Sequence, residues 1–258
     1  MRAALSRLAA TALRPFDREI VSSEELRGLR DLRSDVSSLL ELPTKKLAAL
    51  TELRERAKSQ LQQDLFVLSE LDFKERGYFV EFGATNGVDL SNTWILEKDF
   101  GWRGILAEPA RCWHDELAIN RVAHVETRCV WRDSTSTLQF NETRDAVLST
   151  VQEFSASDYH QKNREGGRLY DVSTLSLIDM LDKYGAPHHV DYLSIDTEGS
   201  EYEILSHFDF DKYEFGIITC EHNYTPARKQ IFDLLTGKGY RRKYLGLSQW
   251  DDWYVKAP

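Results

Sequence analysis

The chain has 258 residues, of which 41% are hydrophobic and 11% aromatic, enough apolar material for a sizeable core rather than a disordered protein. Its net charge of -9 argues against a nucleic-acid partner, because proteins that bind phosphate backbones usually carry a basic face. No run approaches the roughly 20 apolar residues that span a bilayer, so we expect no membrane span. Three scattered cysteines match neither a disulfide framework nor a metal-binding spacing, which favours a reducing compartment, the cytoplasm.

The first part of the chain is charged, rich in leucine and free of strand-like runs. Residues 1–16 hold three arginines and no acid, which fits an amphipathic helix, with a mitochondrial transit peptide as the alternative. Between Leu47 and Leu68, apolar residues recur at spacings of three and four, and this predicts an apolar helical face. We therefore expect an N-terminal helical extension over residues 1–75 that packs on the main domain, forms a homodimer contact or covers the substrate.

From residue 76 to 258, apolar runs alternate with helix-like segments, a pattern typical of a doubly wound α/β sheet. Strands are predicted at residues 78–82, 104–108, 124–130, 190–195, 215–220, 240–245 and 253–256, with a short antiparallel piece at 136–140. Helices are predicted at residues 89–100, 111–120, 176–184, 200–208 and 225–238. Residues 141–172 are polar and lack periodicity, so we expect a loop that acts as a lid or binds substrate.

The first predicted strand runs into a glycine turn, Gly83-Ala84-Thr85-Asn86-Gly87. In such a sheet, a turn of small residues lets the backbone approach a nucleotide-like ligand at the carboxyl end of the strand. Glu108 ends the next strand, where a carboxylate can accept hydrogen bonds from both hydroxyls of a ribose. These features predict a cofactor that carries adenosine, either a dinucleotide or S-adenosylmethionine (SAM).

The glycine pattern and a nearby acid separate these two cofactors. A dinucleotide fingerprint has a third glycine, which is missing here. Glu81 adds negative charge close to the turn, which disfavours a pyrophosphate and suits the ammonium and sulfonium groups of SAM. SAM is therefore the favoured cofactor, and an NAD-dependent oxidoreductase on a similar sheet stays as the alternative.

Three segments, VEFGATNGVDLSNT, LEKDFGWRGILAEP and YLSIDTEGSEYEIL, occur in this order along the chain. Together they resemble the FkbM family of SAM-dependent methyltransferases, and the last is similar to that family's I-D-x-E-G-x-E-x-x-L signature. The resemblance covers about residues 60–258. It implies a Rossmann-like class I methyltransferase fold, an α/β architecture whose mostly parallel sheet has seven strands, the last antiparallel, and helices on both faces. It also implies O-methylation of a hydroxyl on a saccharide or other small molecule.

The resemblance assigns cofactor contacts by position. The methionine part of SAM would be lined by Glu81, Gly83, Ala84 and Gly87. Ser91 and Asn92 would support that loop or bind the SAM carboxylate. The remaining implied contacts are Glu108 and Pro109 at the ribose, Val130 and Trp131 at the adenine, and Asp196.

An alcohol acceptor must lose a proton, so a general base or a metal ion should lie within hydrogen-bond reach of it. Asp196 and His222 follow neighbouring predicted strands and are the candidate catalytic residues, with His222 the better base by its intrinsic pKa. A divalent cation such as Mg²⁺, held by Asp196, Glu221 and His222, is an alternative form of assistance. A non-catalytic SAM-binding or regulatory protein, which would keep the SAM contacts and lose the base, also stays open.

Overall fold

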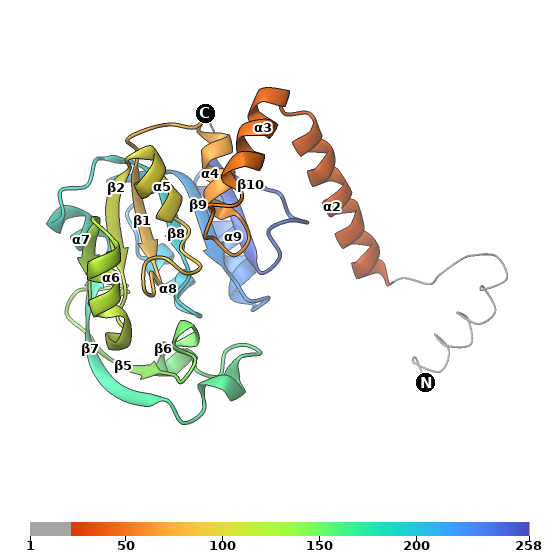
Figure 1. The fold of residues 1–258 in the computed structure, drawn as a ribbon. Helices are drawn as coiled ribbons and strands as arrows, with labels where there is room; N and C mark the ends of the chain where they lie inside the picture. Colours follow the sequence, from red (N-terminus) through yellow and green to blue (C-terminus); the bar gives the residue numbers. More distant parts are fainter. Residues whose placement is uncertain (1–21, 258) are drawn as a thin grey trace, which may run out of the picture.

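The computed structural model describes residues 22–257, so the segment considered as a transit peptide lies outside the described residues. Its main sheet has seven strands in the order β10-β11-β9-β8-β1-β2-β3 (Figure 1). The pairs β3–β2, β2–β1, β1–β8 and β8–β9 are parallel, whereas β11 is antiparallel to both neighbours. The predicted fold class is confirmed. The strands are β1 (Tyr78–Phe82), β2 (Arg103–Ala107), β3 (His124–Glu126), β8 (His189–Ile195), β9 (Glu214–Glu221), β10 (Tyr240–Lys243) and β11 (Asp251–Lys256).

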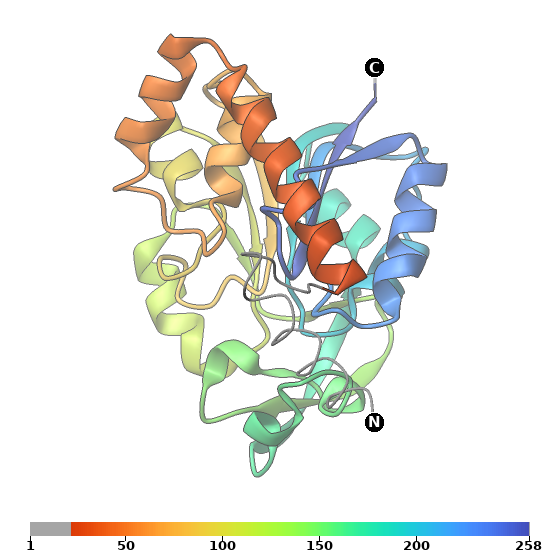
Figure 2. The same cartoon turned by 90° about the vertical axis from the view of Figure 1, so that its right-hand side faces the viewer.

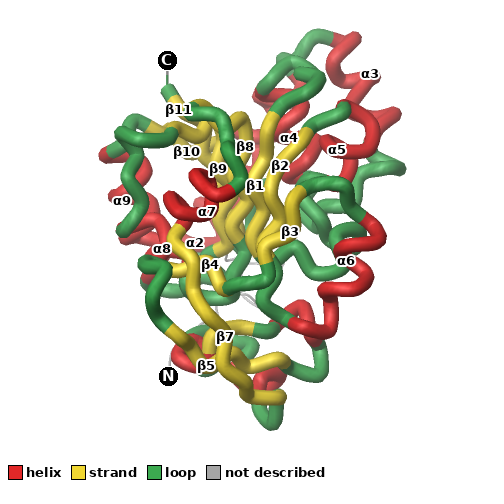
Figure 3. Tube along the Cα trace, turned by 90° about the vertical axis from the view of Figure 1, so that its left-hand side faces the viewer, coloured by secondary structure: helices red, strands yellow, loops and turns green. Residues whose placement is uncertain are grey.

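Helices cover both faces of this sheet (Figure 3). Side chains alternate between the faces along each strand, so Phe79 of β1 packs with one helical layer, and Val80 and Phe82 pack with the other. The first layer contains α4 (Gln63–Glu70), α5 (Trp94–Phe100) and α6 (His114–Asn120), and the second contains α7 (Leu177–Lys183), α8 (Glu201–Ser206) and α9 (Ala227–Gly237). The chain changes direction across the sheet between β1 and β8, which is where ligands bind in such folds.

The N-terminal part forms α2 (Ser23–Leu40), α3 (Thr44–Leu53) and then α4. The predicted row of leucines packs on the chain's own core, and α4 buries Leu65 to Leu68 there. In contrast, α2 runs across the front of the view in Figure 2 and exposes a row of apolar side chains. No helix within residues 22–257 is long and apolar enough to cross a membrane.

A second sheet, in the order β4-β7-β5-β6, lies below the main sheet in Figure 1. Its strands are β4 (Cys129–Trp131), β5 (Thr137–Glu142), β6 (Thr150–Val151) and β7 (Arg168–Ser176), with single turns of 3-10 helix at Ala146–Leu148, Gln152–Phe154 and Gln161–Arg164. A further such turn, Arg111–Trp113, precedes α6. Residues 141–172, expected to form a loop, therefore contribute strand at 141–142, 150–151 and 168–172, and loop with short 3-10 turns between these strands.

The predicted strand 124–130 is also divided between the two sheets. β3 ends at Glu126, whose carboxylate accepts hydrogen bonds from the backbone N–H of Arg128 (3.1 Å) and from its guanidinium (2.9 and 2.8 Å). This local ion pair fixes a bend, after which β4 pairs with β7 instead of β2. Val130 consequently enters the site from the second sheet.

Candidate active site

A cavity lies at the carboxyl ends of β1, β2 and β8 and is closed on its other side by the second sheet. It encloses about 980 Å³ of empty space, part of it open to solvent. The main sheet contributes the glycine turn, Glu108 and Asp196, and the second sheet contributes Val130, Phe140 and Val151. The predicted cofactor segments thus meet at one cavity.

Glycine is required at both ends of this turn, because the backbone angles are left-handed and neighbouring atoms leave no room for a Cβ. Gly83 has a φ of +73°, and a Cβ there would lie 2.1 Å from the carbonyl oxygen of Asp196. Gly87 has a φ of +78°, and a Cβ there would lie 2.6 Å from Cγ of Arg121. Only glycine satisfies both conditions at these positions, so the turn lies against Asp196, directly after β8, at one end and against Arg121, directly after α6, at the other.

Glu81 organises the loop that follows the turn. Its carboxylate accepts hydrogen bonds from the backbone N–H of Asn92 (2.7 Å) and from the hydroxyl of Ser91 (3.1 Å). The helix predicted from residue 89 therefore begins only at Trp94, because residues 89–93 form a loop held by this acid. Glu81 also lines the cavity, and its assignment as a direct SAM contact stays a prediction.

Arg121, which the sequence analysis did not single out, completes this arrangement. Its fully buried guanidinium lies 3.8 Å from Glu81 and 3.2 Å from Glu97, and donates to the carbonyl of Gly87 and the hydroxyl of Ser91, both at 3.0 Å. Burial raises the pKa of Glu81, and the charge of Arg121 opposes that shift. Arg121 therefore links the glycine turn to its supporting loop.

Asn92 lines the cavity and carries a buried acceptor without a partner. Its amide nitrogen donates to the hydroxyl of Ser194 (2.9 Å), whereas its buried Oδ1 has no hydrogen-bond partner within the described residues. An oxygen of this kind on a cavity wall suits a ligand with an ammonium group, because a buried acceptor left without a donor costs free energy. The residues present therefore fit the amino-acid part of SAM.

Glu108 fits the ribose position. It is 4% exposed, and its two oxygens accept one backbone N–H each, from Thr85 and Ala110, both at 2.8 Å. Each oxygen keeps capacity for a further donor such as a ribose hydroxyl. Pro109 and Val130 also line the cavity, whereas Trp131 does not and packs edge-on against Phe154, with ring centroids 6.1 Å apart.

We expect SAM affinity to fall as pH is lowered, because burial raises the pKa of Glu108 to about 7. The carboxylate is the better acceptor for two hydroxyls, and its population falls roughly fivefold between pH 7 and pH 6. Calorimetric titration at pH 8, 7 and 6 measures the change in Kd. Glu108→Gln, which does not titrate, should show weaker binding with no corresponding step. An identical pH profile in that variant would assign the effect to another group.

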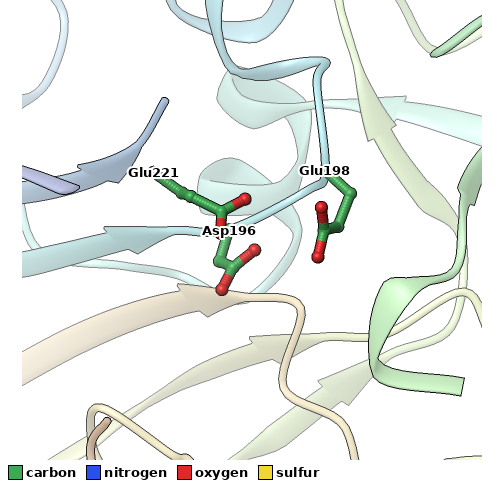
Figure 4. Close-up of side chains that lie close together, drawn as sticks. All are labelled: Asp196, Glu198 and Glu221. Atoms are coloured by element: carbon green, nitrogen blue, oxygen red, sulfur yellow. The ribbon is translucent and has the colours of Figure 1, made fainter. Parts of the chain in front are cut away.

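Three carboxylates gather at the centre of the site (Figure 4). Asp196 follows β8, Glu221 ends β9, and Glu198 lies in the turn after β8; one oxygen from each lies within 4.8 Å of the others. Burial raises the pKa of all three acids; repulsion from Asp196 adds to the shift of Glu198 and Glu221, and repulsion from Glu201 adds to that of Asp196. Such a cluster can accept a proton or hold a hard cation.

Arg164 enters this cluster from the second sheet. It is 2% exposed, and its Nη2 lies 2.6 Å from Oε2 of Glu198. The same guanidinium pairs with both oxygens of Asp158 (2.9 and 3.0 Å), and its Nε donates to the carbonyl of Leu148 (2.9 Å). The segment expected to be a loop is therefore tied to the main sheet by a buried cation.

His222 does not reach the cavity. It is 4% exposed, its Nδ1 accepts a hydrogen bond from the backbone of Tyr224 (3.0 Å), and its Nε2 lies 3.7 Å from Asp252. Successive residues at a strand end point to opposite faces, so Glu221 faces the acid cluster and His222 faces away. Burial also lowers the pKa of His222 to about 4. The structure brings Glu198, not His222, to Asp196 and Glu221.

The strand order, the glycine turn and Glu108 at the end of β2 are features of a Rossmann-like site for an adenosine cofactor. The family model described as the methyltransferase FkbM domain matches residues 81–242, and the chain belongs to this family. It is accordingly a SAM-dependent methyltransferase. Among solved structures, it is similar to precorrin-6y C5,15-methyltransferase from Geobacter metallireducens, with 12% identity, coverage of 70% of this chain and 71% of that chain, and a TM-score of 0.38. No curated protein matches the chain.

Proposed function

We propose that the protein transfers the methyl group of SAM to a hydroxyl of a saccharide or other small molecule. The observation that carries this proposal is that Glu81, Gly83, Asn92, Glu108 and the half-buried acid Asp196 line one cavity. SAM supplies a methyl group already activated by its sulfonium. The protein's part is to bind and orient: Glu108 takes the ribose, Asn92 the ammonium, and the glycine turn admits the ligand close to the backbone.

Asp196 is the group that we assign to proton removal. It lines the cavity next to the glycine turn, and burial raises its pKa toward the range that suits a base near neutral pH. The alternative, a divalent cation, would use Asp196, Glu198 and Glu221 in place of the trio that includes His222. We favour the base, because Arg164 already supplies positive charge to Glu198.

Calorimetry with SAM and with NAD, followed by transfer of a labelled methyl group to a panel of hydroxyl compounds, tests the proposal. Micromolar SAM binding without NAD binding would remove the oxidoreductase alternative. Transfer of the methyl group to a hydroxyl would exclude the alternative of a non-catalytic SAM-binding protein. A protein that binds NAD and not SAM would contradict the proposed function.

We expect Asp196→Asn to lower the transfer rate on the order of 100-fold, the usual contribution of a general base, while the Kd for SAM changes less than about threefold. His222→Gln is the matched comparison, since its ring faces away from the cavity and its loss should leave the rate within about threefold. A rate that survives in Asp196→Asn and is lost in His222→Gln would return the role to the histidine.

The same assay addresses the metal. Added chelator should leave the wild-type rate unchanged if Asp196 acts as a base. A loss of activity that Mg²⁺ restores would establish the cation alternative instead.

We also propose a homodimer through α2 and residence in the cytoplasm. The exposed apolar row of α2 supports the dimer, and three free cysteines support a reducing compartment. The row consists of Leu26, Leu29, Leu32, Val36 and Leu40. Sedimentation velocity at micromolar concentration measures the oligomeric state, and a monomer there would contradict the dimer.

A further inference from the structure

One wall of the cavity is built by residues outside the family-matched segment 81–242. Gln60 comes from the loop before α4, and Gln63 is the first residue of α4. Trp250 directly precedes β11, and Asp251 begins it. These residues belong to this chain's own N-terminal and C-terminal parts, so they are candidates for what distinguishes its substrate.

The loop that carries Gln60 and leads to Gln63 is fixed in place. Ser59 forms a parallel bridge with Leu90, next to the glycine turn, and its hydroxyl donates to the buried carboxylate of Asp64. The same carboxylate accepts the backbone N–H groups of Lys58 (3.2 Å) and Leu65 (2.8 Å). A buried acid with several donors holds this loop as a rigid wall.

A buried hydrogen bond joins the two parts of this wall. Nε2 of Gln63 donates to Oδ2 of Asp251 at 2.8 Å, and the two residues are 4% and 6% exposed. Oε1 of Gln63 in turn accepts the backbone N–H of Leu61 at 2.9 Å. The Gln63–Asp251 pair therefore sets the distance between the loop and β11.

Two members of the wall keep groups free for a ligand. The amide of Gln60 has no side-chain hydrogen bond to any residue in the range 22–257. Trp250 is half-buried, and its hydrogen bonds within residues 22–257 use only its carbonyl, which accepts the N–H groups of His222 (2.9 Å) and Asn223 (3.3 Å). Both side chains can be changed without removing these backbone contacts.

The strand order places Asp251, at one end of this wall, across the site from the ribose position. Along the carboxyl edge, Asp251 stands on β11, Asp196 on β8, and Glu108 follows β2. The predicted base thus lies between the ribose position and the Gln63–Asp251 pair. A methyl acceptor must lie beside the base on the side that the cofactor does not occupy.

We propose that Gln60, Trp250 and the Gln63–Asp251 pair form the acceptor subsite and bind a ring with neighbouring hydroxyl groups, of the pyranose class. Amide and carboxylate groups exchange hydrogen bonds with hydroxyls, and an indole offers an apolar surface to the C–H face of a sugar ring. This inference rests on the proposed methyl transfer from SAM, and it assigns acceptor choice to residues outside 81–242.

The test uses the full chain saturated with S-adenosylhomocysteine and a panel of methyl glycopyranosides, with binding measured by ligand-observed NMR. Gln60→Ala and Trp250→Leu should each weaken glycoside binding about tenfold, which corresponds to about 1.4 kcal/mol. Calorimetry should show a Kd for SAM within about twofold of wild type in both variants. Trp250→Phe should restore most of the glycoside affinity, because it keeps an aromatic surface. Gln249→Ala, the neighbouring exposed glutamine that does not line this cavity, is the control.

Wild-type protein that binds SAM and no glycoside of the panel would overturn the pyranose assignment. Glycoside binding that is unchanged in both Gln60→Ala and Trp250→Leu would overturn the location of the subsite. Absence of SAM binding in the wild-type protein would instead overturn the proposed function, and the subsite with it.

Discussion

Gly83→Ala is expected to abolish SAM binding and to destabilise the protein strongly. The new Cβ would lie 2.1 Å from the carbonyl oxygen of Asp196, and a backbone atom directly after a central strand cannot move away cheaply. The φ of +73° adds a conformational cost of about 1–2 kcal/mol for any residue with a side chain. Relief of the clash must move the glycine turn away from β8. The glycine turn would then also move away from Asp196, the proposed base.

Gly185→Ala is the matched control for this substitution. Gly185 has a φ of +60°, and no atom lies within 4 Å of the position of a new Cβ. Gly185→Ala should therefore cost about 1–2 kcal/mol in backbone strain, without a clash. Urea unfolding and calorimetry with SAM measure both effects. Comparable stability losses in the two variants, with SAM binding intact in Gly83→Ala, would show that the contact with Asp196 is unimportant.

The second large effect is expected for Arg164→Met, which should lower the free energy of unfolding by about 3–5 kcal/mol. Removal of the guanidinium leaves the carboxylates of Asp158 and Glu198 buried without their cation. It also removes the ion pair that ties the second sheet to the main sheet, so the wall that carries Phe140 and Val151 should loosen.

Arg132→Met provides the comparison for a pair on the surface. Arg132 lies 3.3 Å from Glu203, its side chain is 49% exposed, and such pairs contribute about 0–1 kcal/mol. Urea unfolding monitored by fluorescence gives both values, and hydrogen exchange of residues 146–164 reports local loosening. A loss below 1 kcal/mol in Arg164→Met would mean that the two acids are held by other groups.

Local sequence patterns were sufficient to predict the fold class and the side of the cavity that the main sheet forms. Period-two strands followed by small or acidic residues locate the carboxyl edge of a parallel sheet, so Gly83, Glu108 and Asp196 could be placed together from the chain alone. The assignment of His222 as a base conflicts with the alternation of side chains along a strand, which could have been applied to the sequence alone. If Glu221 faces the site, the residue after it faces away.

The remaining contacts depend on partners that are far apart along the chain. Arg164 meets Glu198 from a segment without hydrophobic periodicity, and no spacing signals which of several arginines becomes buried. Arg121 lies close to Glu81 across the glycine turn, and no local pattern in the sequence predicts this contact either. Gln63 and Asp251 are 188 positions apart, so their hydrogen bond follows from the order of strands in space and not from a local pattern.

The position of α4 has a consequence for how the protein can be divided. A fragment of residues 76–258, the domain that composition alone delimits, would leave Phe79, Tyr192 and Trp253 without the helix that covers them. It would also lack Gln63, so Asp251 would lose its buried donor. The smallest unit expected to fold and to choose its acceptor therefore begins before α4, at the loop where Ser59 meets Leu90.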